Sequence, residues 1–100
     1  MSLARKLSLP ALAAALIAAA SPATALDCNA VAQEASDLFV ARASKDMGTY
    51  SSIRDTMLGQ PDHRKMFRML VRAVDEGLYA TPESMQKAAT KYCTRTLASN

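Results

Sequence analysis

Apolar residues recur every three or four positions over most of the chain beyond residue 26, and this is the period of an α-helix buried on one side. The first run can be capped by Asp27 or Asn29, because a short polar side chain binds the free N–H groups of a first turn. We expect Gly48 to end this helix in the left-handed conformation that glycine adopts without strain. The apolar face of the run consists of Cys28, Val31, Ala32, Ala35, Leu38 and Phe39.

The second and fourth helices are predicted from the signals at their ends. The fourth begins at Thr81, whose hydroxyl can cap it, with Pro82 in the first helical position, where a missing N–H has no intrahelical partner anyway. One face of the fourth helix carries Met85, Ala88, Ala89, Tyr92, Cys93 and Thr96. The second helix is short, begins at Ser51 or Ser52 and ends at Gly59. Its apolar residues are Ile53, Met57 and Leu58.

The third helix is predicted over residues 61–76, between Pro61 and Gly77. His63, the only histidine in the chain, falls within the apolar arc of its helical wheel, and Met69 lies at the border. The other members of the apolar arc are Met66, Phe67, Leu70, Val71, Ala73, Val74 and Leu78. The opposite arc carries Arg64, Lys65, Arg68, Arg72, Asp75 and Glu76.

The two cysteines test this helix count. Cys28 and Cys93 lie near the two ends of the helical region, and an even number of cysteines in a small exported domain indicates a disulfide. In an up-down bundle four helices return the chain to the end where it began, which would bring both cysteines together. No run alternates with the period of a strand. We therefore predict an all-α domain, a small four-helix bundle with three longer helices and one short one, closed by a disulfide staple.

The N-terminus predicts export. Arg5 and Lys6 precede an uncharged apolar run of about 14 residues, and the small-x-small triplet 23–25 follows. This order is typical of a secretory signal peptide, and the run is shorter than the ~20 residues that a membrane anchor needs. We expect cleavage after Ala25. One helical domain, residues 26–100, would then remain in the periplasm or outside the cell, without a transmembrane anchor.

Composition and charge limit the function. The chain carries a net charge of +3, but Arg5 and Lys6 belong to the predicted signal, so the mature domain is close to +1 and a nucleic-acid partner is not expected. Its core must be built from Ala, Leu, Val and Met, since Trp is absent. The single histidine faces the predicted core and both cysteines are paired, so neither a Ser-His-Asp nor a cysteine nucleophile is supported. We expect no enzyme and no cofactor.

His63, Met66 and Met69 suggest a copper site, because imidazole and thioether ligands suit Cu(I). However, steps of three residues drift by ~60° each around a helix axis, so these three side chains diverge. A partner such as Met57 would have to complete the site. The interpretation that we prefer is that the methionines fill gaps in and beside the core.

Arg64, Arg68 and Arg72 recur at i, i+4 and i+8, with Lys65 beside them. Like charges at this spacing repel by a few tenths of a kcal/mol per pair, and cations near a helix N-terminus are disfavoured. Local stability therefore does not explain the stripe. It indicates a contact surface for an acidic protein or an anionic envelope component, unless it is a solvated face neutralised by nearby carboxylates.

The layout C…LFVARASKDMG…GLYATPESMQKAATKYC resembles small exported bacterial proteins in which two cysteines frame a helical domain. By size, compartment and cysteine use the chain is also similar to acid-stress periplasmic chaperones and to the immunity proteins of toxin systems. Our leading hypothesis is a non-enzymatic periplasmic or secreted interaction module that uses an exposed helical surface. The alternatives are an envelope-stress chaperone, a toxin-immunity protein and a small copper-handling protein.

Overall fold

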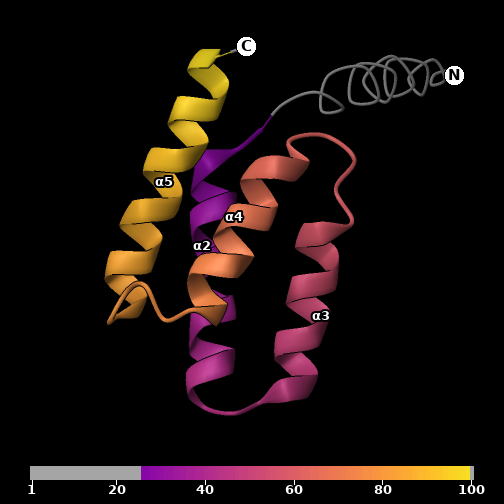
Figure 1. The fold of residues 1–100 in the computed structure, drawn as a ribbon, viewed down its shortest axis with the longest axis vertical. Coiled ribbons are helices and arrows are strands. Elements are labelled where there is room, and N and C mark those ends of the chain that lie inside the picture. The colour runs from indigo at the N-terminus through magenta and orange to yellow at the C-terminus, as the bar shows by residue number, and fades with distance from the viewer. Residues whose placement is uncertain (1–25, 100) are drawn as a thin grey trace, which may run out of the picture.

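The structure, a computed structural model, describes residues 26–99, and that part of the chain holds four α-helices and no strand (Figure 1). The helices are α2 (Cys28–Ala43), α3 (Met47–Leu58), α4 (Arg64–Asp75) and α5 (Pro82–Ser99). The prediction of an all-α, four-helix fold is confirmed. The predicted signal peptide, residues 1–25, lies outside the described residues. Among the helices described, none is long and apolar enough to cross a membrane.

The other helices are arranged around α2. It contacts each of the other three, and its contact with α5 is the most extensive in the bundle. In Figure 1, α4 lies in front of α2, with α5 on one side and α3 on the other. The core between them is mostly Ala, Leu, Val and Met, as composition predicts, with Tyr50 and Phe67 added. Its largest fully buried side chains are Leu38, Met57, Leu70, Met85 and Cys93.

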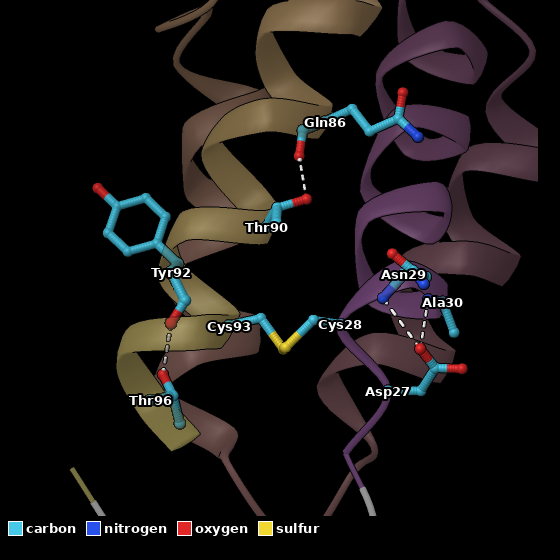
Figure 2. The surroundings of a disulfide bond; sticks show 9 residues. All are labelled: Asp27, Cys28, Asn29, Ala30, Gln86, Thr90, Tyr92, Cys93 and Thr96. Carbon is cyan, nitrogen blue, oxygen red and sulfur yellow. Dashed lines mark hydrogen bonds between the residues drawn. A yellow bond between two sulfur atoms is a disulfide. The ribbon is translucent and has the colours of Figure 1, made fainter. Parts of the chain in front are cut away.

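A disulfide joins Cys28, the first residue of α2, to Cys93 in the second half of α5 (Figure 2). The two Cα atoms lie 5.5 Å apart although 65 positions separate the residues in sequence. The predicted pairing is confirmed, and so is its place at one end of the bundle. Asp27 caps α2 beside it, because its carboxylate accepts the N–H groups of Asn29 at 3.0 Å and Ala30 at 3.3 Å.

The end of α2 differs from the prediction. The helix ends at Ala43 rather than near Gly48, and Lys45 takes the left-handed conformation with φ of 61°. The N–H groups of Lys45 and the residue after it donate to the carbonyls of Arg42 and Ala41, which satisfies two free carbonyls of the last turn. A lysine therefore does here what glycine usually does, so the sequence carries no glycine signal at the true end.

The second helix is longer than predicted as a result. It begins at Met47, four residues before Ser51, and its 12 residues equal those of α4. Asp46 caps it, accepting the N–H of Thr49 at 3.2 Å and its hydroxyl at 2.7 Å. Gly48 thus lies in the first turn of α3. The predicted stop at Gly59 is confirmed, since that residue is the C-cap of the helix.

The third helix begins later than predicted. It starts at Arg64 rather than Pro61, because His63 before it is left-handed, with φ of 58°, and cannot belong to a right-handed helix. The residues between α3 and α4 are needed to reverse the chain between two adjacent antiparallel helices. At the other end Gly77, with φ of 66°, follows the helix as predicted. Leu78 lies beyond this turn and is 61% exposed, so it is not part of the apolar arc.

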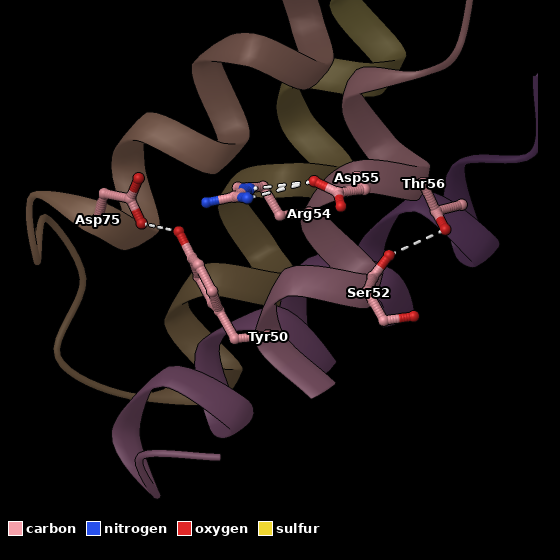
Figure 3. A network of polar contacts seen from close by, with 6 residues as sticks. All are labelled: Tyr50, Ser52, Arg54, Asp55, Thr56 and Asp75. Carbon is pink, nitrogen blue, oxygen red and sulfur yellow. Dashed lines mark hydrogen bonds and ion pairs between the residues drawn. The ribbon is translucent and has the colours of Figure 1, made fainter. Parts of the chain in front are cut away.

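A polar contact fastens α2, α3 and α4 at the end of the bundle away from the disulfide. The Tyr50 hydroxyl donates to the Asp75 carboxylate (Figure 3). Arg42 donates from Nη2 to the Asp75 carbonyl at 3.2 Å, and its Nη1 lies 3.8 Å from the Asp75 carboxylate. Burial raises the pKa of Tyr50, and its hydrogen bond to Asp75 and that residue's charge raise it further.

Removing the disulfide should destabilise the domain severely. For Cys28→Ala with Cys93→Ala we expect the free energy of unfolding to fall by roughly 4 kcal/mol, because the unfolded chain loses the restriction of a long closed loop. Urea unfolding followed by circular dichroism measures this. The wild type under reducing conditions is the control and should lose a similar amount. A loss below about 1 kcal/mol in both would contradict a stapling role.

Tyr50→Phe should lower the free energy of unfolding by about 1 kcal/mol at neutral pH, because it removes a hydrogen bond to a carboxylate. Since the pKa of Tyr50 is raised in the folded state, the stability it supplies is full below pH 10 and is lost as the pH rises through the raised value. The difference in the free energy of unfolding between the wild type and Tyr50→Phe should therefore become smaller at alkaline pH. Asp55→Asn, which removes the exposed ion pair with Arg54, is the control and should change stability by less than about 0.5 kcal/mol. A stability difference that did not change with pH would contradict a stabilising hydrogen bond from the Tyr50 hydroxyl.

Candidate functional site

Charge is unevenly distributed over the four helices. α4 contains four cations and one carboxylate, and α5 contains three cations and one carboxylate. α2 has two carboxylates and one cation, whereas α3 has one of each. The small net charge of the domain thus conceals a basic half, formed by α4 and α5.

The exposed side of α5 carries a basic stripe that the sequence analysis missed. Lys87, Lys91 and Arg95 recur at i, i+4 and i+8, and all three are exposed. The same spacing singled out the α4 arginines, so it could have identified these residues as well. The Tyr92 ring points away from α2 in Figure 2, whereas its neighbour Cys93 faces α2. The buried and basic faces of α5 therefore lie on different sides of the helix.

Two adjoining clefts border this stripe. One has a volume of about 570 Å³ and is lined by Tyr79, Ser84, Lys87, Ala88, Lys91, Tyr92 and Arg95. The other has a volume of about 540 Å³ and is lined by His63, Arg64, Lys65, Met66, Met69, Tyr92, Arg95, Thr96 and Ser99. Because Tyr92 and Arg95 line both clefts, we treat them as one feature, the basic groove. It is formed by the start of α4, one side of α5 from Ser84 to Ser99, and the connection before α5.

The cations of the basic groove have no carboxylate partner in the described part of the chain. The groove is lined by five of them: Arg64, Lys65, Lys87, Lys91 and Arg95. The three ion pairs within residues 26–99 use other cations, namely Arg42, Arg54 and Arg72. No aspartate or glutamate is among the residues that line either cleft. The cations of the groove are therefore held without direct ion pairs to carboxylates in residues 26–99.

The structure divides the basic stripe that was predicted on the third helix. Arg64 and Lys65 line the groove and join the cations of α5. Arg68 is exposed and lines neither cleft. Arg72 lies with its Nε 3.6 Å from the Glu76 carboxylate, an exposed pair one turn apart. Half of the predicted contact surface therefore belongs to the candidate site, and Arg72 matches the alternative of a neutralised face.

The three candidate metal ligands all line the second cleft, but their surroundings do not suit a metal ion. Met66 is buried, Met69 is 39% exposed, and His63 is half-buried at the N-cap of α4 rather than within the helix as its wheel position implied. Arg64 and Lys65 line the same cleft, and their charge repels a cation. Within residues 26–99 no group of three or more His, Cys, Asp or Glu residues could hold a metal.

Two tyrosines supply an aromatic part of the groove. Tyr79 comes from the connection before α5 and is half-buried beside Tyr92. Burial raises the pKa of Tyr79, and the neighbouring Tyr92 raises it further. The Arg95 guanidinium lies 5.8 Å from the centroid of the Tyr92 ring, within the range of a cation–π contact. The groove therefore combines cations with aromatic surface.

The chain matches no protein-family model, no curated protein and no solved structure. The function must therefore be inferred from the chemistry of the groove. That chemistry consists of ammonium and guanidinium groups on two helices, with tyrosine, methionine and alanine side chains between them. Such a site attracts anions and offers apolar surface at the same time.

Lys91→Gln should stabilise the domain, because Lys91 has like-charged neighbours at i−4 and i+4, Lys87 and Arg95. We expect the free energy of unfolding to rise by about 0.5 kcal/mol at low ionic strength. The gain should disappear at about 1 M salt, where the repulsion is screened. Lys87→Gln is the matched control and should change little, since Lys87 has the carboxylate of Glu83 at i−4 as well as Lys91 at i+4. Destabilisation by Lys91→Gln would show that its charge has a partner within the fold.

Proposed function

We propose that the mature domain, residues 26–100, is a non-enzymatic binding module that holds an anionic partner in the basic groove. The observation that carries this proposal is that five cations from two helices line one groove without a carboxylate among the lining residues. Like charges one helical turn apart, as in the α5 stripe, reduce the stability of the folded state. An anionic partner would remove that repulsion on binding, which supports the groove as the contact surface.

The predicted export of the protein supports the same proposal. A disulfide between the first and last helices is characteristic of proteins in oxidising compartments. Together with the signal peptide predicted at residues 1–25, it favours action in the periplasm or outside the cell. An anionic protein or envelope component is a suitable partner there.

The hydroxyl groups in the groove favour binding over catalysis. Thr96 donates its hydroxyl to the Tyr92 carbonyl at 2.8 Å, and Ser99 donates to the Arg95 carbonyl at 2.9 Å. Ser84 is similarly engaged with the Thr81 carbonyl at 2.9 Å. A serine or threonine nucleophile needs a base beside it to take its proton. The Thr96 and Ser99 hydroxyls are instead bound to carbonyls of α5, and the Ser84 hydroxyl is bound to a carbonyl just before that helix. No carboxylate lines the groove to orient the His63 imidazole as a base.

The proposal predicts binding of a polyanion at the groove. Fluorescein-labelled poly-L-glutamate should bind the mature protein, and Lys87→Gln with Lys91→Gln should weaken binding about tenfold, because two of the groove cations are lost. Fluorescence anisotropy measures the dissociation constant. Raising the salt concentration should weaken binding further.

The matched control is Lys45→Gln with Arg54→Gln, which removes the same charge from the α2–α3 side of the molecule. It should leave the dissociation constant within about twofold of the wild-type value, since neither residue lines the groove. Equal weakening by both double variants would mean that net charge, not the groove, attracts the probe. The proposal would then be wrong, as it would if the wild type bound no polyanion.

A further inference from the structure

The cations of the basic groove stand on two sides of a concave surface. Arg64 and Lys65 come from the start of α4, and the three cations of the stripe come from α5. In the second cleft Met69 and Tyr92 lie among cations from both helices, whereas in the first cleft Ala88 and Tyr92 lie beside the cations of α5 alone. A flat anionic surface, such as a bilayer, can meet the rims of such a groove but not the apolar groups within it. A narrow chain can contact both.

The spacing of the α5 cations matches an extended peptide. Residues at i and i+4 of a helix are separated by ~6 Å along its axis, which is the step from Lys87 to Lys91 and from Lys91 to Arg95. Alternate residues of an extended peptide lie on the same side and are separated by ~6.7 Å. Carboxylates at alternate positions of the peptide would therefore have nearly the same spacing as the cations of this stripe. The groove follows α5 from Ser84 to Ser99, ~22 Å, which accommodates about seven extended residues.

The residues between those carboxylates would point to the other side of the peptide, toward the groove. There they would meet the half-buried rings of Tyr79 and Tyr92 and the exposed part of Met69. Aromatic and methionine side chains accept apolar groups of varied shape. Arg95, already lying beside the Tyr92 ring, presents a planar guanidinium suited to a carboxylate. Charge and apolar contact thus favour the same partner, an extended peptide in which acidic and apolar residues alternate.

We infer that the basic groove binds an acidic peptide segment of a partner protein in an extended conformation, about seven residues long, with carboxylates at alternate positions and apolar side chains between them. This inference rests on the proposed function and identifies the partner within it. The segment lies along α5, its carboxylates face the α5 stripe, and its apolar side chains cover the tyrosines. Arg64 and Lys65 add positive charge at the second cleft, where they line the groove together with Arg95.

The test compares one peptide with its rearranged form. A labelled seven-residue peptide with aspartate and leucine at alternate positions is titrated with the mature protein, and a peptide of the same composition with its aspartates grouped together is the matched control. We expect the alternating peptide to bind about tenfold more tightly, because only it can satisfy both the stripe and the tyrosines. Vesicles containing phosphatidylglycerol are titrated in parallel as the membrane probe.

A second variant distinguishes binding inside the groove from binding to the cations at its rim. Ala88→Tyr adds bulk to the half-buried floor without changing any cation, and circular dichroism checks that it folds. It should weaken the alternating peptide about tenfold while leaving poly-L-glutamate binding within about twofold, since the long polyanion can use the rim alone. Should this variant fail to fold, Met69→Gln, at a partly exposed position of the second cleft, takes its place, because it removes an apolar contact without changing the charge, and it should weaken binding of the alternating peptide in the same way.

The outcomes distinguish this inference from the proposed function. Tight binding of the alternating peptide, lost in the filled variant, supports the inference. Equal binding of both peptides, retention of the peptide by the filled variant, or binding to vesicles alone would overturn the inference, while an anionic partner at the groove would stand. If neither the peptides, the vesicles nor poly-L-glutamate bound, both would be wrong.

Discussion

The contact between α2 and α5, closed by the bond between Cys28 and Cys93, is the constraint on which the rest of this structure depends. The contact of α5 with α2 is much more extensive than its contact with α4. The packing against α2 therefore determines how α5 is rotated and where it lies along its own axis. The basic stripe is part of α5. Rotation about the helix axis would turn the stripe away from the start of α4, and a slide by one turn would move it by ~5.4 Å. The disulfide prevents both changes.

The two ends of the bundle are stabilised by different kinds of interaction. At one end a covalent bond and the Asp27 cap fix the start of α2. At the other end the contact of Tyr50 and Arg42 with Asp75 joins three helices through hydrogen bonds and charge. Neither set uses a cation of the basic groove. The two ends of the bundle are thus held by groups other than the groove cations, so those cations have no part in either set of contacts.

Much of the fold could be predicted because its signals are local. The apolar period identified four helices, Gly59 and Gly77 marked two of their ends, and the two cysteines allowed a single pairing. The ends that were misplaced are those where Lys45 and His63 adopt left-handed conformations. Such a conformation is uncommon outside glycine, and nothing in the neighbouring residues announces it.

The candidate site was only half predictable for a different reason. Arg64 and Lys65 were identified from spacing within one helix, but their association with Arg95 depends on how α4 packs beside α5. The contact between Tyr50 and Asp75 likewise joins residues from two helices that no local pattern connects. Periodicity indicates which face of a helix is buried, but not which neighbouring helix will share its exposed edge. That information arises only from tertiary packing.

The separation of 65 positions between Cys28 and Cys93 also has a consequence for the order of assembly. α2 and α3 are joined by a tight turn in which the residues that end one helix directly precede the cap of the next, so they can pair with little loss of chain entropy. α2 and α5 are the most distant helices along the chain, and joining them requires the largest loop to close. The groove between α4 and α5 depends on that long-range contact, because packing against α2 sets the rotation of α5. A chain in which α2 and α5 have not yet met therefore carries all of these cations without the arrangement that forms the groove.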